Sequence, residues 1–165
     1  MDTNNIRSAR IVDAARLAEI YNYYILHTTV TFEVEPVTAD EMARRIAEIS
    51  ADYPYYVYES DGRVIGYTYA HPWNKRAAAK GHSLETTVYL DHEAKHEGVG
   101  SALMNHLIER CKTEGYHALI ANVTDENQAS QAFHESLGFK QVAYYTEVGR
   151  KFNRWLGIKA FEKML

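Results

Sequence analysis

Cysteine is nearly absent from this sequence: Cys111 is the only one among 165 residues, so no disulfide can form within the chain. A reducing compartment, and therefore a cytoplasmic location, is expected. No run of 18 apolar residues is present, so the sequence predicts no membrane-spanning helix. The opening segment MDTNNIRSAR lacks the apolar core of a signal peptide. The net charge of −4 leaves no basic excess, so neither nucleic acid nor an anionic membrane is an expected partner.

Proline is also scarce, and no segment reads as a linker. The three prolines stand far apart, and no repeat or low-complexity tract is present. A length of 165 residues suits one domain and leaves little room for two. We therefore expect a single domain over residues 1–165.

Seven segments have the alternation or the apolar, β-branched and aromatic content that is typical of strands. They are Ile6–Ala9, Tyr55–Glu59, Val64–Ala70, Leu84–Leu90, Leu119–Val123, Phe139–Val148 and Trp155–Leu165. Helices are expected after the N-cap residues Asp13, Thr38 and Asn127, and over Gly98–Cys111. The order β-α-α-β-β-β-α-β-α-β-β predicts an α/β fold, with a mixed, partly antiparallel sheet of about six to seven strands and about four helices.

A glycine-containing turn precedes the third of these helices. Gly98, Val99, Gly100 and Ser101 open it shortly after the strand Leu84–Leu90. Glycine lets a ligand approach the backbone closely, and the first turn of a helix offers unpaired N–H groups at the positive end of its dipole. The turn is therefore a candidate site for an anion such as a pyrophosphate. An ordinary strand–helix turn is the alternative.

Polar residues gather on one face of the helix that follows Asn127. Asn127, Ser130 or Gln131, and His134 are spaced three to four residues apart and share that face. These side chains either meet solvent or line a cleft. The opposite face is apolar and carries Ala129, Ala132, Phe133 and Leu137.

Five segments, in this order, resemble the GNAT N-acetyltransferase superfamily, and most closely its branch of phosphinothricin and methionine-sulfone acetyltransferases. They are TTVTFEVEP (28–36), YPYYVYESDGRVIGYTYAHPW (53–73), ETTVYL (85–90), EGVGSAL (97–103) and NQASQAFHESLGF (127–139). The resemblance covers nearly the whole chain. It implies a GNAT-type fold, acetyl-CoA as cosubstrate, and a homodimer in which the segment Phe152–Leu165 completes a neighbour's pocket.

The resemblance also implies which residues bind acetyl-CoA. The turn of Lys95, His96, Glu97, Gly98, Val99 and Gly100, with Ser101 after it, would cradle the pyrophosphate through backbone amides. The pantetheine arm would pair with Val88, Tyr89 and Leu90, and Asn127 and Ser130 would contact CoA. In relatives a Gln or Arg stands where this chain has Lys95, and Glu97 adds negative charge, so weaker electrostatic attraction for CoA is expected.

For catalysis, the resemblance assigns Glu85 as the base that takes a proton from the acceptor amine, directly or through one water. A carboxylate that merely faces solvent at the start of a strand is the alternative. His134 stands where many relatives have a Tyr acid, and it is expected to act as acid, as second base or as a structural residue. Direct attack in a ternary complex is expected, so Cys111 is assigned to core packing.

The acceptor is expected to be a small amino-acid-like amine. Phe32 and Tyr89 are candidate walls of its pocket. Lys75 and Arg76 match a basic segment that faces the acceptor pocket in relatives, so the resemblance makes them candidates to bind the acceptor carboxylate, with surface charge as their alternative role. Three alanines, Ala77 to Ala79, stand where relatives often have an aromatic residue, and one residue appears inserted before Glu85. Both departures bear on the identity of the acceptor.

Three other interpretations remain at this point. His92-Glu93-Ala94-Lys95-His96 matches the HExxH zinc motif, but it lies in a short turn with no downstream ligand in place, so no metal is expected. A CoA-binding sensor without activity would have the same fold. An acetyltransferase acting on protein N-termini or polyamines is the third, because a fold does not fix a substrate.

Overall fold

The computed structural model describes residues 5–94 and 98–165. Its order of elements is the expected one, with a short 3-10 turn at Ile11–Asp13 in addition. The strands are β1 (Ile6–Ser8), β2 (Tyr55–Ser60), β3 (Arg63–Pro72), β4 (Ser83–Leu90), β5 (Ala118–Thr124), β6 (Lys140–Lys151) and β7 (Arg154–Met164). The helices are α1 (Ala14–His27), α2 (Ala39–Ser50), α3 (Val99–Thr113) and α4 (Gln128–Ser136).

All seven strands form one sheet in the order β1-β2-β3-β4-β5-β7-β6. The pairing of β4 with β5 is parallel and the others are antiparallel. The fold is therefore the predicted α/β fold with a mixed sheet. Within the described residues, none of the helices combines the length and apolar character needed to cross a bilayer.

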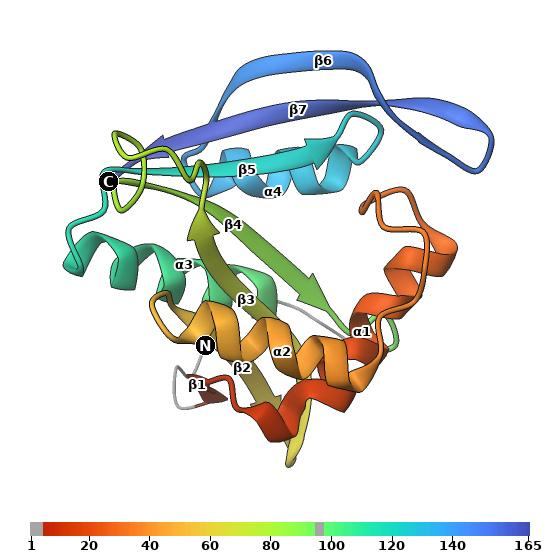
Figure 1. Cartoon of the computed structure of the whole chain (residues 1–165), viewed down its shortest axis with the longest axis vertical. Helices are drawn as coiled ribbons and strands as arrows, with labels where there is room; N and C mark the ends of the chain where they lie inside the picture. The colour runs from red at the N-terminus through yellow and green to blue at the C-terminus, as the bar shows by residue number, and fades with distance from the viewer. Residues whose placement is uncertain (1–4, 95–97) are drawn as a thin grey trace.

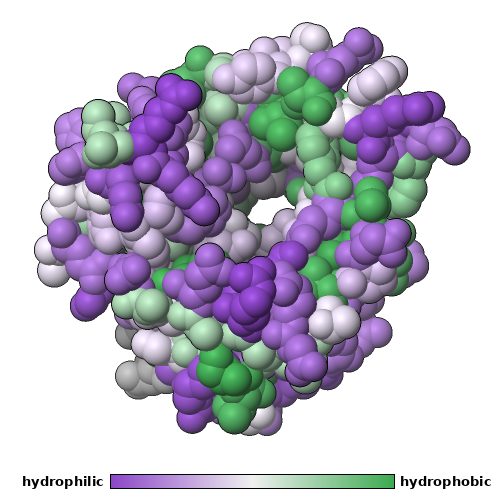
Figure 2. Space-filling model, viewed as in Figure 1, coloured by the Kyte–Doolittle hydropathy of each residue, from purple (hydrophilic) through white to green (hydrophobic). Residues whose placement is uncertain are grey.

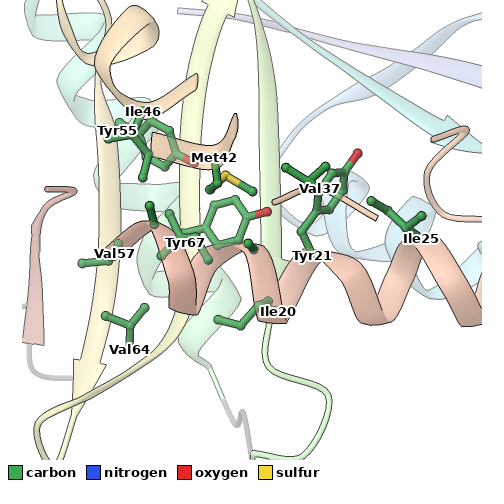
Figure 3. Close-up of a cluster of buried hydrophobic side chains, with 13 residues drawn as sticks. Ile20, Tyr21, Ile25, Val37, Met42, Ile46, Tyr55, Val57, Val64 and Tyr67 are labelled. Atoms are coloured by element: carbon green, nitrogen blue, oxygen red, sulfur yellow. The ribbon is translucent and has the colours of Figure 1, made fainter. Parts of the chain in front are cut away.

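Helices α1 and α2 cover one face of the sheet, and α3 and α4 the other (Figure 1). The core under α1 and α2 contains side chains from both helices and from β2 and β3, which converge in Figure 3. The second core contains Leu84, Met104, Leu107, Leu119 and Phe161, from α3 and the other end of the sheet. Successive side chains of a strand point to opposite faces of its sheet, so the alternating side chains of β4 contact different cores.

Local signals in the sequence account for several element ends. The Thr38 hydroxyl accepts a hydrogen bond from the Glu41 backbone N–H at 3.1 Å, so Thr38 is the predicted N-cap of α2. Asp61 and Gly62 both have positive φ, 51° and 74°, which fits the tight turn predicted between β2 and β3.

Asp13 precedes α1 but does not cap it. Its carboxylate accepts hydrogen bonds from the Arg10 backbone N–H at 2.8 Å and from Arg7. These contacts close the 3-10 turn instead. The expectation of an Asp13 side-chain cap was wrong because two partners nearer the chain start engage the carboxylate.

The faces of α4 also differ from the expected ones. Ala129 and Ala132 are exposed, whereas His134 is only 5% exposed and packs against Phe133, Phe139 and Phe161. The buried stripe of this helix therefore runs through the histidine. Two alanines count as apolar in a sequence pattern but contribute little area to burial.

Candidate functional site

Strands β4 and β5 run side by side for only three residue pairs, Ser83 with Ala118, Leu84 with Leu119 and Glu85 with Ile120. Beyond Glu85 the two strands diverge, as Figure 1 shows. β5 continues along β7 and β4 continues along β3. In the part of the chain that the structure describes, one edge of β4 from Thr86 onward therefore has no neighbouring strand, and its backbone faces the gap.

A cavity of about 560 Å³ occupies this gap. Figure 2 shows an opening that passes through the molecule at the place where β4 and β5 separate. Most of the cavity lining comes from the segment between α1 and α2, from β4 and β5, and from α4 with its N-cap. Tyr24 of α1, Gly100 of α3 and Ile158 of β7 complete it. Among the residues proposed from the sequence, the lining includes Phe32, Glu85, Val88, Tyr89, Leu90, Gly100, Asn127, Ser130 and His134.

Glu85 lies at the point where the strands separate. It is the last β4 residue paired with β5, it is half-buried, and it lines the cavity. On its other side it is paired in register with His71 of β3. A carboxylate at the mouth of a gap can take a proton from a bound amine directly or through one water.

His134 enters the cavity from α4 as a buried ring. Burial lowers its pKa, and the hydrogen bond to the Ser130 backbone carbonyl opposes that change. Nδ1 lies 2.8 Å from that carbonyl oxygen. Since a carbonyl only accepts, the proton of the neutral ring is on Nδ1, and Nε2 carries the lone pair. The ring is thus suited to accept a proton rather than to donate one near neutral pH.

The first turn of α3 has the geometry of an anion site. Gly98 has φ 78°, in the left-handed region, and no side-chain cap bonds to this end of the helix among the described residues. The first N–H groups of α3 are therefore available to an anion. Gly100 packs close to Leu90 and Phe133. Gly98, Val99 and Ser101 are not among the residues that line the cavity, and Lys95, His96 and Glu97 lie outside the described residues.

Asn127 and Ser130 have structural contacts as well as a place in the cavity. Asn127 Oδ1 accepts from the Ser130 backbone N–H at 3.1 Å and so caps α4, as its position in the sequence predicted. The Ser130 hydroxyl lies 3.4 Å from His134 Nδ1. The Asn127 amide nitrogen is not engaged by this cap. Both residues line the cavity.

The expected acceptor residues are divided between two places. Phe32 is half-buried and lines the cavity. Lys75 and Arg76 are exposed in the loop between β3 and β4 and are not among the lining residues. That loop follows Pro72, which pairs with Leu84 next to Glu85.

The segment from Thr28 to Val37 is fixed to the sheet by contacts that the sequence did not reveal. Lys151 Nζ donates to the Thr31 carbonyl at 2.9 Å, and the Thr124 hydroxyl donates to the Thr29 carbonyl at 2.7 Å. Burial lowers the pKa of Lys151. These contacts join residues about 100 positions apart, so no local pattern could show them.

Several lining residues were not predicted from the sequence, among them Tyr24 and Asn122. Tyr24 Oη donates to the Leu90 carbonyl at 2.6 Å, at the end of β4. Asn122 is exposed to the cavity in the middle of β5. Asn is depleted in strands, so its place in the apolar run ALIANVT was a usable signal.

His92, from the zinc-like HExxH motif, and Cys111 lie in surroundings different from those of the cavity residues. His92 stacks on Tyr23 with ring centroids 3.4 Å apart, in a turn rather than a helix. Within residues 5–94 and 98–165 there is no group of three or more His, Cys, Asp or Glu side chains placed to hold a metal. Cys111 is fully buried, and burial raises the pKa of its thiol to about 12.

Comparison with known proteins agrees with this geometry. The sequence model of the acetyltransferase (GNAT) domain family matches residues 6–157 of this chain. The L-amino acid N-acyltransferase MnaT of Escherichia coli is 36% identical over 98% of this chain and 94% of its own length. The L-methionine sulfoximine/L-methionine sulfone acetyltransferase of Salmonella typhimurium is 33% identical over 97% of this chain and 94% of its own.

A solved acetyltransferase structure has the same fold as this chain. A phosphinothricin acetyltransferase from Sinorhizobium meliloti, in complex with acetyl-CoA, superposes with a TM-score of 0.92 at 34% identity, covering 97% of this chain and 87% of that one. The match of the family model, the fold and the gap between β4 and β5 support one conclusion: this chain is an N-acetyltransferase and belongs to the GNAT family.

Proposed function

We propose that this enzyme transfers the acetyl group of acetyl-CoA to the primary amine of a small amino-acid-like acceptor, by direct attack in a ternary complex. The observation that carries the proposal is the cavity between β4 and β5, whose lining includes Phe32, Glu85, Asn127, Ser130 and His134. Two substrates entering from opposite sides would meet beside Glu85.

The residues on the α3 and α4 side fit acetyl-CoA, which supplies a reactive acetyl thioester when bound. The first turn of α3, from Gly98 to Ser101, has no side-chain cap among residues 5–94 and 98–165, and its N–H groups would bind a pyrophosphate. The free edge of β4 over Val88, Tyr89 and Leu90 offers backbone groups to an extended amide-containing arm. Asn127 and Ser130 would add side-chain hydrogen bonds, and Lys95, His96 and Glu97 belong to the same proposed turn.

Glu85 is the proposed base. An amine is protonated at neutral pH and must lose a proton before it attacks a carbonyl carbon. Glu85 would hold that proton, directly or through one water. The acceptor amine is the source of the protons in this reaction, and the CoA thiolate that leaves is their final acceptor. His134, neutral and with Nε2 unprotonated, is proposed to act as a second base for the amine.

The acceptor class is inferred from similar proteins that act on amino acids and their sulfone and sulfoximine analogues. Phe32 is proposed to contact the acceptor side chain, and Lys75 and Arg76 its carboxylate. The support for the last two residues is that their loop follows the β3 segment paired with Glu85.

Product identification tests the function. The enzyme is mixed with acetyl-CoA and, separately, methionine sulfone, methionine sulfoximine, phosphinothricin, spermidine and a short peptide, and the products are identified by mass spectrometry. We expect N-acetylated product from the amino-acid analogues. Acetylated peptide or spermidine alone would establish the alternative acceptors instead. Acetyl-CoA binding without any product would favour a sensor.

We further propose a homodimer that uses the β6–β7 hairpin. Strand β6 is exposed along most of its length, and Figure 1 shows it at one edge of the sheet. The hairpin presents exposed apolar or aromatic side chains: Val142, Tyr144, Tyr145, Val148, Phe152, Trp155 and Met164. Such a concentration is typical of an interface, and a twofold axis would pair the surface with itself.

Sedimentation equilibrium tests the dimer. The wild type should sediment at twice the chain mass of 18.9 kDa. Charged residues at two exposed positions, in Tyr145→Glu/Val148→Glu, should shift it to the monomer mass. A wild type that is monomeric at micromolar concentration would contradict the proposal.

We also propose a cytoplasmic location, a reaction that needs no metal, and no nucleic-acid or membrane partner. The location is supported by the buried thiol of Cys111. The metal-free reaction is supported by the presence of a carboxylate base that suffices for amine attack. The net charge of −4 speaks against nucleic-acid and membrane partners. Cell fractionation tests the first, and full activity in the presence of EDTA tests the second. Sedimentation with DNA and with anionic vesicles tests the third.

A further inference from the structure

Phe32 lies between the cavity and strand β6. It lines the cavity, and it lies against Gly149. A Cβ built on Gly149 would lie within 2.7 Å of three Phe32 ring atoms, Cδ2, Cε2 and Cζ. Carbon atoms in contact prefer a separation of about 3.5–4.0 Å. The absence of a side chain at position 149 is therefore what allows the ring its present place.

The backbone of Gly149 does not itself require glycine. Gly149 lies in strand β6, and its φ is outside the left-handed region. Gly62, Gly81, Gly98, Gly115 and Gly138 do lie in that region. An alanine at this position would not strain the backbone. Its conflict would be with Phe32.

An irregularity in β6 carries Gly149 to this position. Tyr145 pairs with Ile158 and Gly149 pairs with Leu156, so β6 advances four residues while β7 advances two. Extra residues on one strand bend it and change the direction of the strand after the bend. The bend sets the β6 backbone against the segment that bears Phe32.

That segment is held on both sides of Phe32. Lys151 Nζ donates to the Thr31 carbonyl at 2.9 Å, and the Thr31 hydroxyl lies 2.8 Å from Tyr21 Oη. Glu33 accepts two hydrogen bonds from Arg45, at 2.6 and 3.0 Å. Because the backbone is fixed, pressure from position 149 would move the ring, and the free volume next to the ring is the cavity.

We propose that Gly149 determines the size of the acceptor that this enzyme admits, by letting the Phe32 ring rest on β6 instead of occupying the acceptor side of the cavity. The proposal rests on the proposed function and identifies a residue outside the cavity lining as a specificity determinant. Any side chain at position 149 shortens the longest acceptor side chain that fits.

The test compares two acceptors that differ by one methylene, methionine sulfone and the shorter S-methylcysteine sulfone. The measured quantity is the ratio of their kcat/KM values. Gly149→Ala should lower the ratio of longer to shorter acceptor by about tenfold, the scale of one methylene in a tight pocket. The KM for acetyl-CoA should stay unchanged, because Phe32 lies on the acceptor side.

Phe32→Leu supplies the matched variant. Phe32→Leu alone should raise the ratio of kcat/KM for the longer acceptor to kcat/KM for the shorter one, since a smaller side chain leaves more room in the cavity. Combined with Gly149→Ala, it should bring the ratio back toward the wild-type value, because the two changes act on the same contact. An unchanged ratio in Gly149→Ala, or no recovery in the double variant, would overturn the proposal. If Gly149→Ala does not fold, Phe32→Leu alone decides: an unchanged ratio overturns it.

A crystal structure of Gly149→Ala gives a result that does not depend on turnover. The proposal predicts the Phe32 ring displaced into the cavity. A ring in its present place, with β6 moved away, would overturn it. A wild type that acetylates neither sulfone refutes the proposed acceptor, and the crystal structure then still decides the role of Gly149.

Discussion

His134 illustrates how a single side chain obtains its chemistry from its surroundings. Three phenylalanine rings remove it from water, and a backbone carbonyl fixes the proton on Nδ1. Burial is the larger influence on its pKa and lowers it. The sequence left acid, base and structural roles open, and this arrangement favours a neutral ring.

The lowered pKa predicts a pH dependence of stability. As the pH falls below 6.5, the ordinary value, the unfolded chain binds a proton at this residue before the folded chain does. The free energy of unfolding should therefore keep this contribution above that pH and lose it progressively below. Denaturant titrations should show a larger loss between about pH 7 and about pH 5.5 for the wild type than for His134→Gln.

His27→Gln is the matched control, because His27 is exposed at the end of α1. It should lose stability over this pH range as the wild type does. Equal losses in the wild type and in His134→Gln would contradict the assignment of a buried neutral ring.

Part of the cavity lining could be predicted from the sequence and part could not. Glu85, Asn127 and His134 were predicted because each belongs to a short motif in a recognisable element, and all three line the cavity. Lys151 was not found, because its contact with Thr31 joins two distant segments. Lys75 and Arg76 were predicted through the resemblance, and they are exposed in a loop and are not among the residues that line the cavity.

At the scale of elements, two of the three predicted N-caps have the expected side-chain contact, and Asp13 does not. Thr38 and Asn127 cap α2 and α4 through the side-chain contacts expected of them. The buried face of α4 was harder to predict, because a helix of nine residues gives few turns in which to read a period. The irregularity in β6 was invisible, since it depends on the register with β7.

The cap of α2 gives a stability prediction. Thr38→Ala removes the acceptor for the Glu41 backbone N–H and should lower the free energy of unfolding by about 1 kcal/mol. Denaturant unfolding measures the change. Ser50→Ala, at the exposed other end of α2, is the control and should change little. Equal effects of the two substitutions would show that the hydroxyl of Thr38 contributes nothing as a cap.

At the scale of the whole molecule, the sheet joins both cores. β4 contacts α1 through Tyr89 on one face of the sheet, and its alternate side chains join the cores that contain α3 on the other face. We propose that residues 1–165 form a single domain on this basis. Thermal unfolding should then show one transition, with equal calorimetric and van't Hoff enthalpies per folding unit. Two separated transitions would contradict it.

The central claim is that Glu85 at the separation of β4 and β5 takes the proton of an acceptor amine. The most direct test measures CoA release with acetyl-CoA and methionine sulfone for the wild type, Glu85→Gln and, as control, Glu109→Gln, whose side chain is exposed on α3. We predict that kcat falls by about 10²–10⁴-fold in Glu85→Gln alone, with acetyl-CoA binding unchanged by calorimetry. Wild-type turnover in Glu85→Gln would contradict the account.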